Sequence, residues 1–273
     1  MRSRSTNAPA LPASRQRLTE VVRATGDVFT VADAARELRL DRTTAAKMLA
    51  RWTRQGWLRR VGHGAYVSAS LDLLDSNLVL EDPWVLVPAL YAPGYIGGRT
   101  AAHHWDLTEQ LFNDIVVLTA RPIREKEQER QGALFSLKHI AEAKIFGTTP
   151  VWRGQTKIAI SDVHRTMVDM LDDPALGGGI EHVADCLNVY LRRRDRNDAQ
   201  LLAYADRLGN GAVFKRLGFL AERDPNGAPL VEPCRARLTK GNAKLDPAIA
   251  SPRLSARWRL WLPVQWAGAG AAS

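Results

Sequence analysis

The fold is decided by residues 41–55, which read DRTTAAKMLARWTRQ. This stretch carries an apolar stripe at helical spacing, formed by Ala45, Met48, Leu49 and Trp52. Asp41 can act as the N-cap, because its carboxylate accepts hydrogen bonds from the unpaired N–H groups of the first turn. Gly56 suits the position just past the end, where the backbone often takes a positive φ. The pattern predicts a short capped helix with one buried face.

The opposite face of this predicted helix is polar and basic, with Thr44, Lys47, Arg51 and Arg54 at nearly the same spacing. A small helix with such a face can enter the major groove of DNA. It can equally be an ordinary solvated helix on a protein surface. Only the neighbouring elements can decide between these interpretations.

The flanking sequence predicts a winged helix-turn-helix. A helix is expected at residues 14–23, a very short strand at 28–29, and a second helix at 31–38. Thr30 would cap that second helix, with Asp33 at the third position as in a capping box. A tight turn at residues 39–40 leads into the quoted helix. Strands at 57–61 and 65–67, joined by the Gly-His-Gly turn at 62–64, then form the wing.

The distribution of charge favours a polyanionic partner for this module alone. The chain has 273 residues and a net charge of +9. Residues 1–70 hold 13 Arg/Lys and 5 Asp/Glu, a net charge of +8, whereas the remainder carries only +1. Some winged helices bind only protein, but this partition favours double-stranded DNA.

We expect the DNA contacts to come from the third helix and the wing. Thr43, Thr44, Lys47 and Arg51 would reach base edges and nearby phosphates, because Arg can pair with guanine and Thr can contact a thymine methyl. Phosphate contacts are expected from Arg42, Arg54, Arg59 and Arg60. His63 at the wing tip, and Arg2 and Arg4 in a flexible arm at residues 1–13, could reach a minor groove. For each residue alone, an ordinary solvated surface position remains an equal alternative.

The rest of the chain predicts a larger mixed α/β domain at residues 78–266, so that the fold class is α+β. Residues 71–80 are expected to connect the winged helix, at 14–70, to this body. Strands are expected at 114–119, 134–145, 156–160 and 257–264. Helices are expected from Pro83 onward and at 99–105, 162–171, 180–192, 198–208 and 212–220. The Pro/Gly-rich stretch at 224–233 is expected to be a loop. The charged stretch at 125–130 is expected to be a solvated loop or helix end.

Composition and the lack of known motifs argue against several classes of protein. No apolar run approaches the roughly 18–20 residues of a membrane span, and the N-terminus lacks the apolar region of a secretory signal. Cys186 and Cys234 have no metal-ligand spacing and suggest free thiols in a reducing compartment, so we expect a cytoplasmic protein. No nucleophile motif, phosphate-binding loop or dinucleotide fingerprint occurs. We therefore expect no catalytic residues, no metal and no cofactor.

Three patterns leave alternatives open. His103 and His104 could suggest a metal site, but adjacent positions on a helix point apart, and packing is the favoured interpretation. Asp114 followed by Glu142 and Lys144 loosely resembles a metal-dependent nuclease pattern, which often arises by chance. Four tryptophans could be core residues or an apolar protein-binding patch: Trp152, Trp258, Trp261 and Trp266.

Four segments resemble the AbiEi-type antitoxins, a bacterial family with an N-terminal winged helix and a C-terminal antitoxin domain. They are YIGGRTAAHHWDLTEQ at residues 95–110, VHRTMVDMLDDP at 163–174 with a Gly-rich tail at 177–179, FKRLGFLAE at 214–222, and the late WRL at 258–260. Together with the winged helix they span most of the chain. Two departures, Thr-Ala at 100–101 and Phe-Leu-Ala-Glu at 219–222, replace residues more usual in the family.

The resemblance implies a role. Such proteins repress their own operon through the winged helix and counteract a cognate nucleotidyltransferase-like toxin, directly or functionally, through the C-terminal domain. Homodimers on an inverted repeat are expected by analogy with other helix-turn-helix proteins. The alternatives are a metal-dependent nuclease targeted by a winged helix and a transcriptional regulator that senses a ligand.

Overall fold

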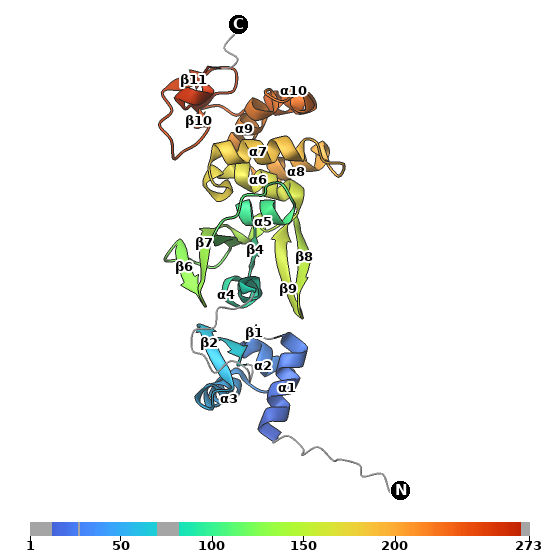
Figure 1. The fold of residues 1–273 in the computed structure, drawn as a ribbon, viewed down its shortest axis with the longest axis vertical. Helices are drawn as coiled ribbons and strands as arrows, with labels where there is room; N and C mark the ends of the chain where they lie inside the picture. Colours follow the sequence, from blue (N-terminus) through green and yellow to red (C-terminus); the bar gives the residue numbers. More distant parts are fainter. Residues whose placement is uncertain (1–12, 27, 70–81, 269–273) are drawn as a thin grey trace. The chain divides into compact units, whose positions relative to one another are not determined.

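The computed structural model of the chain describes residues 13–26, 28–69 and 82–268. The predicted arm and the predicted connection at 71–80 lie outside these residues. The chain divides into two compact units. One comprises the residues up to Leu90 together with Trp152–Lys157, and the other comprises Tyr91–Val151 and the chain from Ile158 onward. The fold class is α+β, as predicted, with N-terminal helices followed by a larger domain built on a mixed sheet (Figure 1).

The N-terminal elements follow the predicted order. They are α1 (Ala13–Thr25), β1 (Val28–Thr30), α2 (Val31–Glu37), α3 (Arg42–Arg54), β2 (Leu58–Gly62) and β3 (Ala65–Ser68). The three strands form one sheet in the order β1-β3-β2, with antiparallel pairing throughout. Thr30 and Asp33 form the predicted capping box of α2. The winged helix-turn-helix prediction is therefore correct in its element types and order.

A small apolar core holds this module together. Val21 of α1, Phe29 of β1 and Ala34 of α2 pack with Leu49 and Trp52 of α3. All five are almost fully buried. The orientation of α3 is fixed because apolar side chains of the other elements are buried against it.

The body contains a mixed sheet. In the described part of the chain, its strands are β4 (Gly94–Ile96), β5 (Asp114–Thr119), β6 (Glu127–Arg130), β7 (Ala133–His139), β8 (Thr148–Arg153) and β9 (Thr156–Ser161), in the order β6-β7-β5-β4-β9-β8. The pairs β5–β7 and β4–β9 are parallel, whereas β4–β5 and β6–β7 are antiparallel. The strand at residues 114–119 has the predicted bounds.

Helices follow and flank this sheet. They are η1 (Pro83–Leu86), α4 (Val87–Tyr91), α5 (Gly98–His104), η2 (Glu142–Lys144), α6 (Val163–Asp172), η3 (Pro174–Gly177), α7 (Ile180–Tyr190), α8 (Asp198–Leu208), α9 (Gly211–Ala221), η4 (Pro225–Gly227) and α10 (Ala228–Ala236). Helix α6 packs on α5, α7, α8 and α9.

A second small sheet, ordered β10-β12-β11, comprises β10 (Ala243–Lys244), β11 (Arg253–Ser255) and β12 (Leu260–Leu262), and η5 (Val264–Trp266) follows it.

Several predicted elements of the body are wrong. The stretch at 125–130 contains edge strand β6, whose Glu127 and Glu129 are exposed, because charged side chains are common on sheet edges. The expected loop at 224–233 contains most of α10, since Leu230 and Cys234 bury one helical face and Pro229 lies in the first turn, where its missing N–H costs little.

Two further strand predictions need correction, and strand β8 was missed. The strand expected at 134–145 ends at His139, where the chain turns into η2. The strand expected at 257–264 is only β12, because a turn with Arg259 at φ 53° precedes it. Strand β8 was not predicted, since Pro150 and its exposed alternate residues lack the apolar signal of a buried strand.

Candidate DNA-binding surface

Helix α3 is held at both ends as its sequence predicts. The Asp41 carboxylate accepts hydrogen bonds from the Thr44 amide at 2.9 Å and the Thr44 hydroxyl at 2.6 Å. These bonds, the Thr44 hydroxyl first, hold the pKa of Asp41 below its ordinary value. At the other end Gly56 has a φ of +74°, which costs glycine little. Because Ala45, Leu49 and Trp52 are buried on one side, the other side of α3 must face outward.

The predicted contact residues lie on that outer side and on the wing. Along α3, all six of the predicted contact residues are exposed: Arg42, Thr43, Thr44, Lys47, Arg51 and Arg54. On the wing, Arg60 and His63 are exposed and Arg59 is half-buried. Arg2 and Arg4 lie outside the described residues. The module therefore presents a cluster of five exposed arginine and lysine side chains on one helix and the adjoining hairpin.

The exposed cations differ in how firmly they are held. Within the described residues, Arg42, Lys47 and Arg54 make no hydrogen bond or ion pair, so their positive charges are available to a ligand. Arg51 lies 3.4 Å from the Ser14 hydroxyl of α1. The Thr44 hydroxyl donates a hydrogen bond to Asp41, so the methyl group is the part of this side chain that remains free to contact a base.

The wing tip is internally braced. The Arg60 Nε donates to the Gly62 carbonyl at 3.0 Å, and its Nη2 lies 3.4 Å from His63 Nδ1. This geometry holds the guanidinium against the tip of the hairpin. Arg60 and His63 would therefore approach a phosphate together rather than independently.

One basic residue was missed by sequence reasoning. The guanidinium of Arg15, on α1, lies 5.5 Å from the ring centre of Trp57. Attraction between a cation and an aromatic face stabilises such a pair. No local pattern could have placed α1 beside the start of β2, because the contact joins residues 42 positions apart.

The nuclease-like pattern in the body does not form a site. Strands β5 and β7 are parallel, with Asp114 opposite Leu134 and Thr119 opposite His139. Asp114 therefore lies at one end of this pair and Glu142, beyond His139, at the other, roughly 17 Å away at about 3.3 Å per residue. Asp114 instead pairs with Arg99. Among the residues that the structure describes, no group of three His, Cys, Asp or Glu side chains could hold a metal ion.

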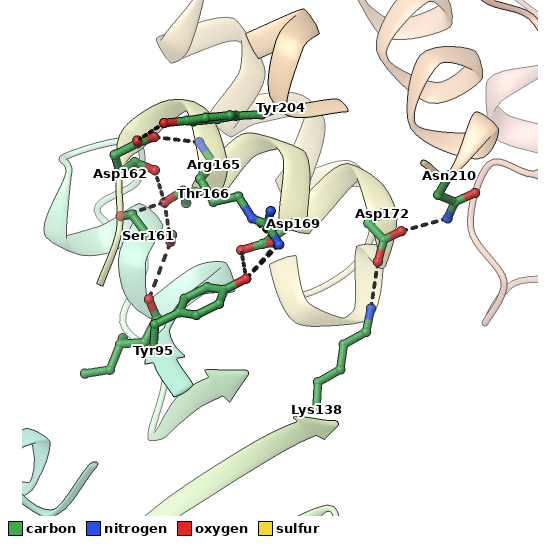
Figure 2. Close-up of polar contacts among 11 residues, drawn as sticks. Tyr95, Lys138, Ser161, Asp162, Arg165, Thr166, Asp169, Asp172, Tyr204 and Asn210 are labelled. Carbon is green, nitrogen blue, oxygen red and sulfur yellow. Dashed lines mark hydrogen bonds and ion pairs between the residues drawn. The ribbon is translucent and has the colours of Figure 1, made fainter. Parts of the chain in front are cut away.

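A buried polar cluster joins two of the segments that carry the family resemblance (Figure 2). The Arg165 Nε donates to Asp169 Oδ1 at 2.9 Å, and Tyr95 donates its hydroxyl proton to the same carboxylate at 3.0 Å. The side chains of Arg165 and Asp169 are only 1% and 2% exposed. Burial raises the pKa of Asp169 to about 6, against the opposing effects of Arg165 and Tyr95. The cluster ties α6 to β4 and exposes no reactive group.

The two other segments also meet. Trp258 is almost fully buried, and its indole N–H donates to Glu222 at 2.7 Å. The Trp258 ring lies so close to Gly218 of α9 that a Cβ at that position would overlap it. The motifs at 214–222 and 258–260 thus build the core of the body rather than a surface site. Trp152 and Trp261 are exposed and Trp266 is partly buried.

Residues 16–69 match a family model described as "Transcriptional regulator, AbiEi antitoxin". The matched residues run from α1 through β3, and they confirm the predicted resemblance over this module. The winged helix is therefore similar to that of a family of transcriptional regulators. No curated protein matches the chain.

A solved structure shares the fold of the chain. It is the crystal structure of the RV2827C protein from Mycobacterium tuberculosis, which aligns with a TM-score of 0.54 over 92% of each chain at 15% sequence identity. At this identity the likeness shows the fold alone. It extends the structural similarity from the winged helix to the body.

None of the described helices is long and apolar enough to cross a lipid bilayer.

Proposed function

We propose that this AbiEi-type protein is a DNA-binding antitoxin that represses its own operon. The observation that carries the proposal is the coincidence of the family match at residues 16–69 with a basic face on α3. Thr43, Thr44, Lys47 and Arg51 would read bases, and Arg42, Arg54, Arg59, Arg60 and His63 would hold phosphates. The partner is double-stranded DNA from the protein's own promoter, bound as a homodimer on an inverted repeat.

The second half of the proposal concerns the body. By its resemblance to AbiEi-type antitoxins, it would counteract a nucleotidyltransferase-like toxin encoded beside it. The protein itself would need no metal or cofactor for either role. The nuclease alternative loses its support, because the acidic residues it needs lie at opposite ends of parallel strands.

Operator binding is tested with the double variant Lys47→Ala, Arg51→Ala in a gel shift on the chain's own upstream DNA. We expect affinity to fall at least about tenfold, because each good base contact contributes about 1–3 kcal/mol. The slope of log affinity against log salt should fall by about one for each phosphate that the variant no longer binds. Both side chains are exposed, so the fold should be unchanged.

The matched control is Arg124→Ala, Lys126→Ala, which removes two exposed cations from the body. This variant should bind like the wild type. Equal affinity of all three proteins would show that α3 does not carry the contact. Absence of any sequence-preferring, salt-sensitive binding by the wild type would refute the repressor role.

Toxin counteraction is tested by co-expression with the adjacent gene. We expect that gene alone to arrest growth and the full chain to restore it. A neighbour that is harmless, or a toxicity that the full chain does not relieve, would refute the antitoxin role.

A further inference from the structure

The first turn of α1 lies against the last turn of α3. Arg51, in the last turn of α3, donates from Nη2 to the Ser14 hydroxyl of α1 at 3.4 Å. Leu18, one turn further along α1, packs on the apolar core that contains Leu49 and Trp52. Residues four apart lie on the same side of a helix, so the packing of Leu18 holds Ser14 beside α3. The contact between Ser14 and Arg51 therefore follows from the way the module packs.

A second cation is held at the same end of α1. Arg15 follows Ser14, and its guanidinium lies 5.5 Å from the ring centre of Trp57. Trp57 comes directly after Gly56 and packs against the same apolar core. The attraction acts between the charge and the ring, so it leaves the guanidinium N–H groups available to an anion such as phosphate. Arg15 is thus held in place and keeps its hydrogen-bond donors.

The described residues offer no counter-charge to these two arginines. Neither Arg15 nor Arg51 forms an ion pair within the part of the chain that the structure describes. The first turn of α1 contains no acidic residue. Glu20 lies five positions beyond Arg15, which turns it by about 140° around the helix at 3.6 residues per turn. Two arginines without a carboxylate partner favour an anionic ligand.

The position of Arg51 along α3 favours the DNA backbone over the bases. A recognition helix contacts base edges with its N-terminal residues, whereas Arg51 is in the last turn. Arg51 lies about 12 Å beyond Thr43 at 1.5 Å per residue, which is about the width of the major groove. When Thr43 lies over the bases, Arg51 therefore reaches the edge of the groove, where the phosphates are. Its guanidinium also lies against Ser14, whereas bidentate pairing with guanine requires it to point into the groove.

We propose that Arg15 and Arg51 bind backbone phosphates at the edge of the major groove, with Ser14 and Trp57 as their positioning residues. The proposal rests on the proposed DNA-binding function and deepens it in two ways. It makes α1 a second element that contacts DNA, and it assigns Arg51 to phosphate rather than to bases. Sequence reading is then left to the first half of α3.

The test measures the affinity of the full chain for its own upstream DNA and for a shuffled duplex of equal length, each over a range of salt concentrations. A phosphate contact carries no sequence information. Arg15→Ala and Arg51→Ala should therefore each weaken binding to both duplexes by the same factor, and each should lower the salt slope by about one. Lys47→Ala should instead lower the ratio of the two affinities about fivefold or more, as expected for a base contact.

The matched control is Arg23→Ala, which removes an exposed cation from the other end of α1 and should bind like the wild type.

Double variants test the two positioning residues. Ser14→Ala should weaken binding to both duplexes but have no further effect in the Arg51→Ala background, because Ser14 acts through that side chain. Ser14→Thr keeps the hydroxyl and should restore the affinity. Trp57→Leu should likewise have no further effect in the Arg15→Ala background, and Trp57→Phe, which keeps an aromatic face, should restore binding.

The outcomes separate this inference from the function on which it rests. A wild type without sequence-preferring, salt-sensitive binding would refute the DNA-binding function itself. A wild type that binds its operator, with Arg15→Ala keeping the same salt slope, would show that α1 does not contact DNA. An Arg51→Ala variant that loses sequence preference would return Arg51 to the base readers. Arg15-dependent binding to anionic phospholipid vesicles, with DNA affinity unchanged by Arg15→Ala, would also overturn the proposal.

Discussion

At the scale of single residues, Gly218 shows how a motif can serve packing. It lies within helix α9, and the ring of Trp258 occupies the space that a Cβ would need. Replacing glycine by alanine in an open helix position stabilises a protein by up to about 1 kcal/mol. At Gly218 the sign should reverse, because the buried Trp258 ring cannot retreat from its hydrogen bond to Glu222.

We predict that Gly218→Ala lowers the free energy of unfolding by about 1–3 kcal/mol, the usual cost of overpacking a core. The measurement is the urea unfolding midpoint, with near-ultraviolet circular dichroism as a second probe of aromatic packing. Gly268→Ala is the matched control, since nothing lies within 4 Å of its added Cβ. A stabilised Gly218→Ala variant would show that Trp258 does not block this position.

At the scale of elements, an ion pair links the sheet to the helices. The Lys138 Nζ of β7 lies 2.9 Å from Asp172, the last residue of α6 (Figure 2). It also lies 3.1 Å from Asp173, the next residue. Asn210, the N-cap of α9, donates to Asp172 at 2.7 Å. Burial acts to raise the pKa of Asp172, but Lys138 and the hydrogen bonds outweigh it and hold that pKa below its ordinary value.

This lowered pKa predicts how stability depends on pH. A carboxyl with a lowered pKa in the folded state stabilises the protein above its unfolded pKa of about 4, and this contribution is lost as pH falls through the folded value. Lys138→Met should therefore cost about 1–2 kcal/mol at pH 7, and the difference from wild type should shrink below about pH 4. Urea midpoints between pH 7 and pH 3 measure this, with Lys126→Met as the control. A difference independent of pH would mean that Lys138 acts by packing alone.

The elements also show where prediction from sequence succeeds. The winged helix could be predicted because its signals are local: Thr30 and Asp41 cap helices, and Gly56 and Gly64 permit turns. Strand β6 and helix α10 could not, because the elements that pack against them decide their structure and their own residue patterns do not. The charged β6 is a strand only because β7 is beside it, and α10 is a helix because α9 covers its apolar side.

Surface residues could likewise be predicted only where their exposure follows from a local pattern. The exposure of Lys47 and Arg51 follows from the helical spacing of the buried residues on α3, so their place on the surface was predictable. The row formed by Lys244, Trp261 and Leu254 was not, because it depends on strand register between segments up to 17 residues apart. Trp258 and Trp261 are close in sequence, yet the first is core and the second is surface.

At the scale of the whole molecule, the positive charge is concentrated in one part of the chain. Residues 1–70, which include the face of α3, carry a net charge of +8, whereas the remainder carries +1. DNA binding is proposed for the first part and toxin counteraction for the second. The proposed functions therefore use separate residues, and a protein that loses one should be able to keep the other.

We predict that Lys47→Ala, Arg51→Ala abolishes repression of the native promoter but leaves growth rescue intact when the protein is expressed from an unrelated promoter. The reason is that both changes remove charge from α3 without touching the core of the body. A promoter–reporter assay and a growth assay on the same strains measure both quantities, with protein levels matched by immunoblot. Loss of both functions in this variant would show that DNA binding and toxin counteraction depend on one another, and that the charge partition does not separate them.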